Sequence, residues 1–135
     1  MFEGVRPRAV LFGIVADIGA TFIAMMLLTS FLGMQVGSEN LSQAELMQLI
    51  EEALQQPPYL LVGGILGLLA TALGGYVAAR TAEVAPLLNA ACVGLFDVVL
   101  GIFLIGGSPL WFSVIGLLLT LPAAIAGGVL FRRTA

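Results

Sequence analysis

Four long apolar runs, separated by charged and turn residues, dominate what this chain can fold into. They cover residues 9–33, 59–79, 87–105 and 110–131. A helix of roughly 20 apolar residues crosses the ~30 Å hydrocarbon core of a bilayer. Backbone polar groups in lipid must be satisfied within the segment, and the runs lack the alternation of barrel strands. The sequence therefore predicts an all-α integral membrane protein, a four-transmembrane-helix bundle forming a single membrane domain over residues 1–135.

The composition agrees with a membrane location and excludes several classes of function. Apolar residues make up 60% of the chain and charged residues 10%, whereas soluble domains have roughly 45–50% and ~25%. The chain has no histidine and one cysteine, Cys92, so we expect no metal, no cofactor and no disulfide framework. No set of catalytic residues stands out, so we expect a protein that is not an enzyme. No basic patch with interleaved aromatic residues is present, which argues against a nucleic-acid partner.

The positions of the charged residues predict the orientation in the membrane. Four alternating spans place every arginine on the same side: Arg6, Arg8, Arg80, Arg132 and Arg133. The positive-inside rule makes that side cytoplasmic, with both chain ends inside. Four glutamates, Glu39, Glu45, Glu51 and Glu52, fall in the first outside loop.

The first outside loop also predicts an amphipathic helix over residues 42–56. Ser42 and Glu45 have the spacing of a capping box, and Pro57 with Pro58 would end the helix. Apolar residues then recur with helical spacing at Leu46, Leu49, Ile50, Ala53 and Leu54. This stripe either packs on its own bundle or meets a partner protein, and both interpretations remain open.

Small residues form stripes in the spans, and helices in lipid associate through such close-packing faces. The expected packing positions are Gly63, Gly67, Gly74, Gly94, Gly101, Gly116 and Gly127, of which the first two form a GxxxG motif. These faces predict contacts within the bundle, with a second copy of the chain or with other membrane subunits. Pro122 is expected to bend the fourth span near Leu118.

Residues 74–82 and 127–135 suggest an internal duplication, because both begin with Gly-Gly and end with Arg-Thr-Ala. Asp17 and Asp97 would then be counterparts in the first and third spans. A tandem two-helix repeat with an axis along the membrane normal would produce this pattern. Chance is the alternative, because glycine and alanine are common throughout the chain.

Asp17 and Asp97 are the charged residues inside the apolar runs, and a carboxylate at the centre of a span costs about 2.5–3.5 kcal/mol. Both lie on small-residue stripes at a similar predicted depth, so both are expected to face the bundle. They are candidates for polar contacts between helices or for a proton or cation site. A catalytic role is disfavoured, because residues 17–19 and 94–97 depart from the motifs of intramembrane aspartyl proteases.

One local pattern resembles a group of known proteins. Gly74-Gly75-Tyr76-x-Ala78-Ala79-Arg80, followed by Pro86-Leu87-Leu88-Asn89-Ala90, is similar to a GGYxAAR pattern in small, uncharacterised four-span bacterial membrane proteins. The resemblance covers the second and third runs. It implies a bacterial inner (plasma) membrane location and carries no activity with it.

Two functions are therefore expected. The first is a non-enzymatic accessory or assembly protein, which packs through its Gly/Ala faces within itself, a homo-oligomer or a larger membrane complex. The alternative is a small oligomeric transporter or channel, coupled to protons or cations, that uses Asp17 and Asp97 and has Pro122 as a bend in its gating helix. The two hypotheses differ in whether Asp17 and Asp97 bind a transported proton or cation.

Overall fold

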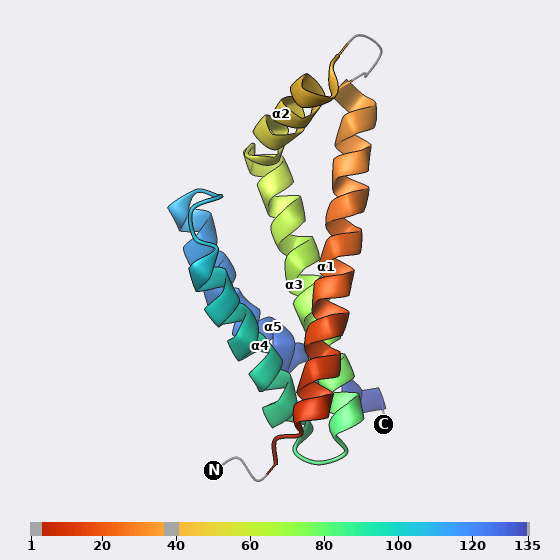
Figure 1. Ribbon diagram of the computed structural model, residues 1–135. Coiled ribbons are helices and arrows are strands. Elements are labelled where there is room, and N and C mark those ends of the chain that lie inside the picture. Colours follow the sequence, from red (N-terminus) through yellow and green to blue (C-terminus); the bar gives the residue numbers. More distant parts are fainter. Residues whose placement is uncertain (1–3, 37–40, 135) are drawn as a thin grey trace.

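The computed structural model describes residues 4–36 and 41–134, and within these ranges the fold is an all-α bundle without strands (Figure 1). The helices are α1 (Pro7–Val36), α2 (Gln43–Leu54), α3 (Pro57–Ala82), α4 (Pro86–Phe103) and α5 (Leu110–Thr134). All except α2 are long and apolar enough to cross a membrane. The chain is thus a multi-pass membrane protein, as its four apolar runs predict.

Proline determines where several of these helices begin. Pro57 and Pro58 lie in the first turn of α3, and Pro86 begins α4. Proline suits this position because the first helical N–H groups have no intrahelical partner. The Pro57–Pro58 pair therefore ends α2 and also begins α3, two residues before the predicted span. In contrast, α4 ends at Phe103 rather than at residue 105, before the turn at Gly106, whose φ is 134°.

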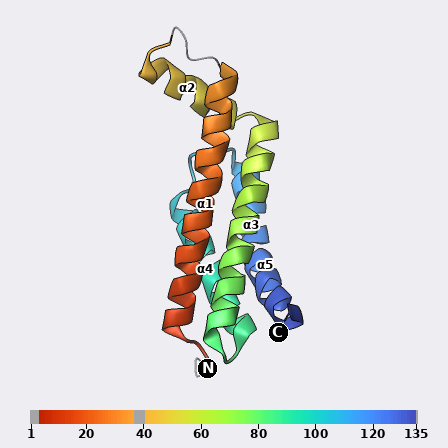
Figure 2. The ribbon, with the colours of Figure 1, turned by 90° about the vertical axis from the view of Figure 1, so that its right-hand side faces the viewer.

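The four long helices form two hairpins, α1 with α3 and α4 with α5 (Figure 1). The hairpins converge where both chain ends lie and diverge towards α2. Figure 2 shows α4 and α5 behind the layer made by α1 and α3. α5 also packs along α3, so α3 is the helix that joins the two hairpins.

One glycine from each Gly-Gly pair of the suggested duplication lies where α3 crosses α5. A Cβ atom on Gly75 would overlap the carbonyl group of Ala124, and one on Gly127 would overlap that of Ala72. Only residues without a side chain allow the two backbones to approach so closely.

Other predicted packing glycines lie at further helix contacts. Gly74 faces Gly13 of α1, since a Cβ on Gly74 would lie 2.8 Å from the Gly13 carbonyl oxygen. A Cβ on Gly94 would lie 2.8 Å from the Ala124 side chain, and one on Gly101 would lie 2.7 Å from Leu117.

Gly63, Gly67 and Gly116 depart from the packing expectation. A Cβ on Gly67 or Gly116 would meet no atom of the described residues within 4 Å, and one on Gly63 would only touch Leu28 at 3.9 Å. The GxxxG motif is therefore not a close helix contact within this chain, because Gly67 faces the cavity described below and Gly63 only touches α1.

The capping box of α2 is present as predicted. The Ser42 N–H donates to Glu45 Oε2 at 2.8 Å, and the Glu45 N–H donates to Ser42 Oγ at 3.3 Å. The helix lies across one end of the bundle (Figure 2), and its apolar stripe is turned largely onto its own chain. Ile50 is buried beside Gly33, and only Leu49 of the stripe is exposed: Leu46, Ala53 and Leu54 are half-buried. This favours self-packing for the stripe.

Charge is divided between the two ends of the bundle. The end at which α1 begins and at which α3 and α5 finish carries Arg6, Arg8, Arg80, Arg132 and Arg133, and we call it the arginine end. The opposite end, the α2 end, carries Glu45, Glu51 and Glu52. Glu39 lies outside the described residues.

Candidate functional site: a carboxyl pair at the floor of a cavity

Asp17 of α1 and Asp97 of α4 come together inside the bundle. Their carboxyl groups are neighbours, and the side chain of Thr71 from α3 lies beside both. Three helices thus contribute one polar group each to a single point. We call Asp17 and Asp97 the carboxyl pair.

The packing around Gly13 and Gly74 explains why these side chains meet. A Cβ on Gly74 would lie 2.7 Å from Asp17 Cβ, so the absence of a side chain lets α1 lie close against α3. Val93 of α4 is fully buried and packs against both glycines. Asp97 follows Val93 by one helical turn on the same face, so its side chain reaches Asp17.

The carboxyl pair, with Asp17 buried and Asp97 half-buried, lacks enough hydrogen-bond donors within the described part of the chain. Asp17 is 6% exposed, and among the described residues neither Asp17 Oδ1 nor Asp97 Oδ2 has a hydrogen-bond partner. Ionised carboxylates only accept hydrogen bonds, so the contact between the two groups is a hydrogen bond only when one carries a proton. Burying unpaired charge is costly, and these oxygens are therefore poised to take up a proton or a cation.

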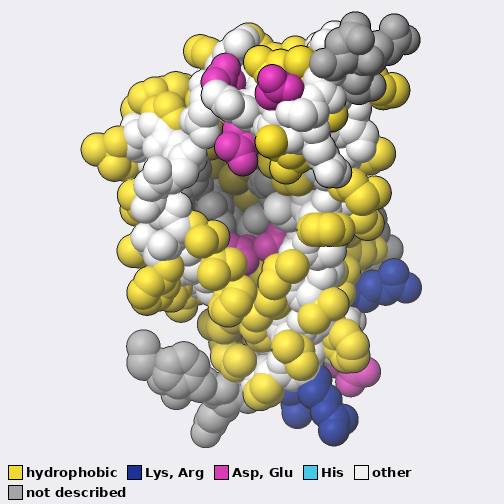
Figure 3. All heavy atoms as spheres, turned by 45° about the horizontal axis from the view of Figure 1, so that its top comes forward, with side chains coloured by type: hydrophobic (Ala, Val, Ile, Leu, Met, Phe, Trp, Pro, Cys, Tyr) yellow, Lys and Arg dark blue, Asp and Glu magenta, His cyan; other side chains and the backbone are white. Residues whose placement is uncertain are grey.

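A cavity of about 400 Å³ lies between the hairpins, and the carboxyl pair lines it. All four long helices contribute to its walls. Figure 3 looks down from the α2 end into the hollow and shows acidic side chains at its floor. The remaining polar side chains of the lining are hydroxyls, and the other lining side chains are apolar or absent. The hydroxyls belong to Thr21, Thr71 and Thr120. We call this space the central cavity.

Two glycines leave room for the central cavity. Gly67 of α3 and Gly116 of α5 line it, and both precede a lining threonine by one turn, Thr71 and Thr120 respectively. The sequence predicts Gly67 and Gly116 as packing positions, whereas in the structure these Gly-x-x-x-Thr patterns line a cavity. Thr120 donates its hydroxyl proton to the Gly116 carbonyl oxygen at 2.8 Å.

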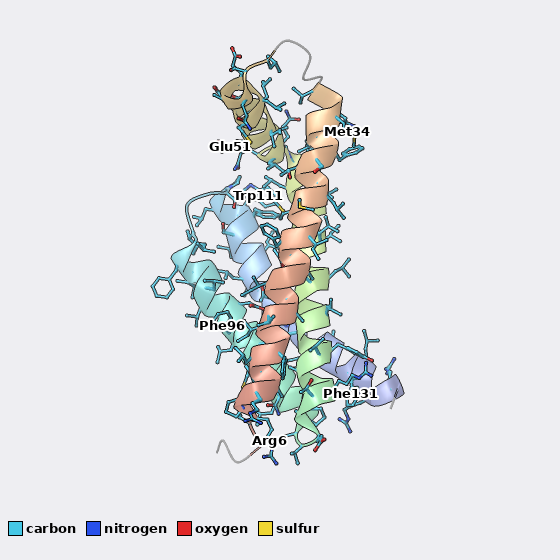
Figure 4. The ribbon with its side chains drawn as sticks, turned by 45° about the vertical axis from the view of Figure 1, so that its right-hand side comes forward. Arg6, Met34, Glu51, Phe96, Trp111 and Phe131 are labelled. Carbon is cyan, nitrogen blue, oxygen red and sulfur yellow. The ribbon has the colours of Figure 1, made fainter. Side chains whose placement is uncertain are left out.

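Aromatic side chains line the central cavity towards the α2 end. Trp111 and Phe112, at the start of α5, lie in an edge-to-face contact with ring centroids 5.8 Å apart. Figure 4 shows Trp111 near α2 and Arg6 at the opposite end of the molecule. Gln55 Nε2 donates to the Gly107 carbonyl oxygen at 2.7 Å, which joins the two hairpins above this aromatic pair.

Asn89 holds the arginine end together, a role that sequence reasoning did not assign. Its side chain is fully buried. Its Oδ1 accepts from the Arg6 N–H at 2.7 Å, and its Nδ2 donates to the carbonyl oxygens of Gly4 at 3.0 Å and Val84 at 3.1 Å. One side chain thereby ties the segment before α1 to the loop between α3 and α4, beyond the floor of the central cavity.

Comparison with known protein families, curated proteins and solved structures finds no match to this chain. Its function is therefore inferred from the carboxyl pair and the central cavity.

Proposed function

We propose that this protein is a small membrane transporter or channel that binds a proton or a cation between Asp17 and Asp97. The observation that carries the proposal is the carboxyl pair itself: two buried carboxyl oxygens without a partner among the described residues, at the floor of a cavity. Ionisable residues inside membrane spans commonly mark ion or proton pathways.

The chemistry of the pair supports competition between protons and cations. Two neighbouring carboxylates repel each other and, where their oxygens are buried, lose the solvation of water; a positive charge between them offsets both costs. A proton and a cation would bind to the same oxygens, so binding of one would displace the other. The Thr71 hydroxyl, beside both carboxyl groups, can donate to whichever group remains ionised.

The orientation of the site follows from the arginines. Under the positive-inside rule the arginine end is cytoplasmic, so the central cavity would face the outside, with N and C termini inside. The GGYxAAR resemblance suggests a bacterial inner membrane. Access from the other side would require the hairpins to part at the arginine end, and Pro122, inside α5, is a candidate bend for that motion.

Flux measurements with purified protein in liposomes test the proposal. We expect proton uptake in response to an imposed membrane potential, or Na⁺ or K⁺ flux that depends on pH. Asp17→Asn and Asp97→Asn should each abolish this flux, because an amide cannot carry the negative charge that attracts the ion. Glu83→Gln, an exposed acid on the loop after α3 at the opposite end from the cavity mouth, is the matched control and should keep wild-type flux.

Circular dichroism and gel filtration establish that each variant is folded. Wild-type protein without proton or cation flux would overturn the proposal. Flux that persists in the Asp17→Asn/Asp97→Asn double variant would also overturn it, because the carboxyl pair would then not be the ion site.

The accessory or assembly function has less support than the sequence suggests. It relies on Gly/Ala faces that are free to contact another protein, but Gly74, Gly94 and Gly127 are used at contacts within the chain. The stripe of α2 is likewise turned largely inwards. If no flux is found and the protein co-purifies with larger membrane subunits at fixed stoichiometry, the accessory function takes the place of the transporter.

A further inference from the structure

From the walls of the central cavity we infer that its ligand is a lipophilic organic monocation, a single positive charge carried by an apolar body. This substrate class rests on the proposed cation site at the carboxyl pair. Three features of the cavity support it: its shortage of oxygen ligands, its size and its aromatic residues.

At the carboxyl pair the central cavity offers fewer oxygen ligands than a site dedicated to an inorganic ion. Divalent cations take about six to eight oxygen ligands, and potassium filters surround the ion with rings of carbonyls. Five side-chain oxygens gather at the carboxyl pair, four from the two aspartates and one from Thr71, and Thr120 is bonded to its own helix. An organic cation carries its own apolar shell and needs only the charge of the carboxyl pair.

The size of the central cavity also fits an organic ligand. Its volume of about 400 Å³ lies within the ~300–1,000 Å³ of typical small-molecule sites, whereas a water molecule occupies about 30 Å³. Gly67 and Gly116 leave this space empty of side chains. A site for a bare ion would not require this room beside the carboxyl pair.

Aromatic and acidic side chains towards the α2 end favour the approach of a cation. Aromatic faces attract cations, and Trp111 and Phe112 line the cavity on that side. Glu51 and Glu52, exposed on α2, add negative potential that attracts cations and repels anions. An apolar cation would therefore pass acidic and then aromatic groups before it reaches the carboxyl pair.

Binding can be written as an exchange of charge. When the pair holds one shared proton, the cation takes the place of that proton between the two carboxylates. The O–H bond breaks, the proton leaves to water, and no other covalent bond changes. One positive charge enters the site and one leaves it, so the net charge of the site is constant.

The test uses purified full-length protein in mild detergent and three probes. Tetraphenylphosphonium has the proposed chemistry, tetraphenylborate has the same shape with the opposite charge, and tetramethylammonium has the charge without the apolar body. The single tryptophan of the chain, Trp111, reports occupancy by its fluorescence. Proton release is followed in weakly buffered solution.

We expect tetraphenylphosphonium to bind saturably and to release about one proton for each cation, as the exchange requires. The other two probes should bind far more weakly. Asp17→Asn should weaken tetraphenylphosphonium binding roughly tenfold to a hundredfold, the range for losing a charged hydrogen-bonding partner.

A matched pair of glycine variants tests where the probe binds. Gly67→Val adds bulk to the central cavity and should weaken binding about tenfold or more, since small volume changes in an apolar pocket have effects of that size. Gly19→Val is the control: a Cβ there also meets no atom within 4 Å, but Gly19 does not line the cavity, so binding should be unchanged.

Equal binding of tetraphenylphosphonium and tetraphenylborate, or equal effects of the two glycine variants, would overturn the inference. If tetraphenylphosphonium does not bind but aspartate-dependent proton, Na⁺ or K⁺ flux is present, the organic ligand is excluded and the proposed function stands. If neither binding nor flux is found, both fail. Binding that is unaffected in Asp17→Asn would exclude the carboxyl pair as the recognition site.

Discussion

At the scale of single residues, glycine has two opposite uses in this bundle. At Gly75 and Gly127 the missing side chain lets two backbones touch, because any Cβ would overlap a carbonyl group on the neighbouring helix. At Gly67 and Gly116 the missing side chain leaves the central cavity empty. The same residue type therefore closes the bundle at one level and opens it at another.

The two uses predict opposite outcomes for one substitution. Gly75→Val should destabilise the protein by about 1–3 kcal/mol or more through overpacking, whereas Gly67→Val should leave stability nearly unchanged. Both replace a mid-helix glycine of α3 by valine, so helix propensity is matched. Thermal unfolding in detergent, followed by circular dichroism, measures the difference. Equal unfolding temperatures for the two variants would contradict the assignment of Gly75 to a close crossing.

At the scale of elements, α2 depends on its own N-terminus. It is short, and hydrogen bonds from the Ser42 hydroxyl and backbone N–H hold the Glu45 carboxylate. These bonds lower the pKa of Glu45 below its ordinary value. Because the folded state then binds the proton less readily than the unfolded state, the stabilisation is present above the unfolded-state pKa. It is lost as the pH falls through the lower pKa of the folded helix.

Amide hydrogen exchange in α2 measures this dependence. We expect protection of α2 amides to decrease as the pH falls through and below the ordinary glutamate range, after correction for intrinsic exchange. Ser42→Ala should weaken the helix at neutral pH by ~1 kcal/mol, and Glu45→Gln should remove the pH dependence. Glu51→Gln, outside the cap, is the control and should retain it. An unchanged pH profile in Glu45→Gln would exclude the capping box as its source.

At the scale of the whole molecule, the two hairpins are held at both ends by different bonds. Asn89 ties the arginine end through several backbone groups, and Gln55 bonds to Gly107 at the α2 end. The convergence of the helices closes the arginine end, and their divergence leaves the hollow seen in Figure 3. Because the hollow opens towards the α2 end, the orientation of the protein decides from which side of the membrane the carboxyl pair can be reached.

Cysteine labelling tests the orientation. In a Cys92→Ser background, Glu51→Cys should react with a membrane-impermeant maleimide in intact spheroplasts, because α2 is expected outside. Glu83→Cys, on the loop at the arginine end, should react only after the membrane is permeabilised. Reversed labelling would place the central cavity on the cytoplasmic side and contradict the assignment from the arginines.

Features that depend on residues close together along the chain could be predicted from the sequence. The four spans follow from local hydropathy, the start of α2 from the spacing of Ser42 and Glu45, and the common end of the arginines from counting spans. Helix lengths were less predictable, because Pro57 can end one helix and begin the next.

The meeting of Asp17 with Asp97, the central cavity and the separate roles of Gly67 and Gly75 depend on how the helices cross. Both glycines lie on one helix within a glycine-rich stripe, and local spacing does not say which of them faces a backbone and which faces a void. That is decided by the angle between hairpins, which follows from packing at Gly13, Val93 and Ala124. Sequence therefore determined the spans and the common end of the arginines, because hydropathy and charge act residue by residue along the chain. The sequence named Asp17 and Asp97 as candidates, but only the tertiary structure decided that they meet, because they come from helices whose contacts no local pattern encodes.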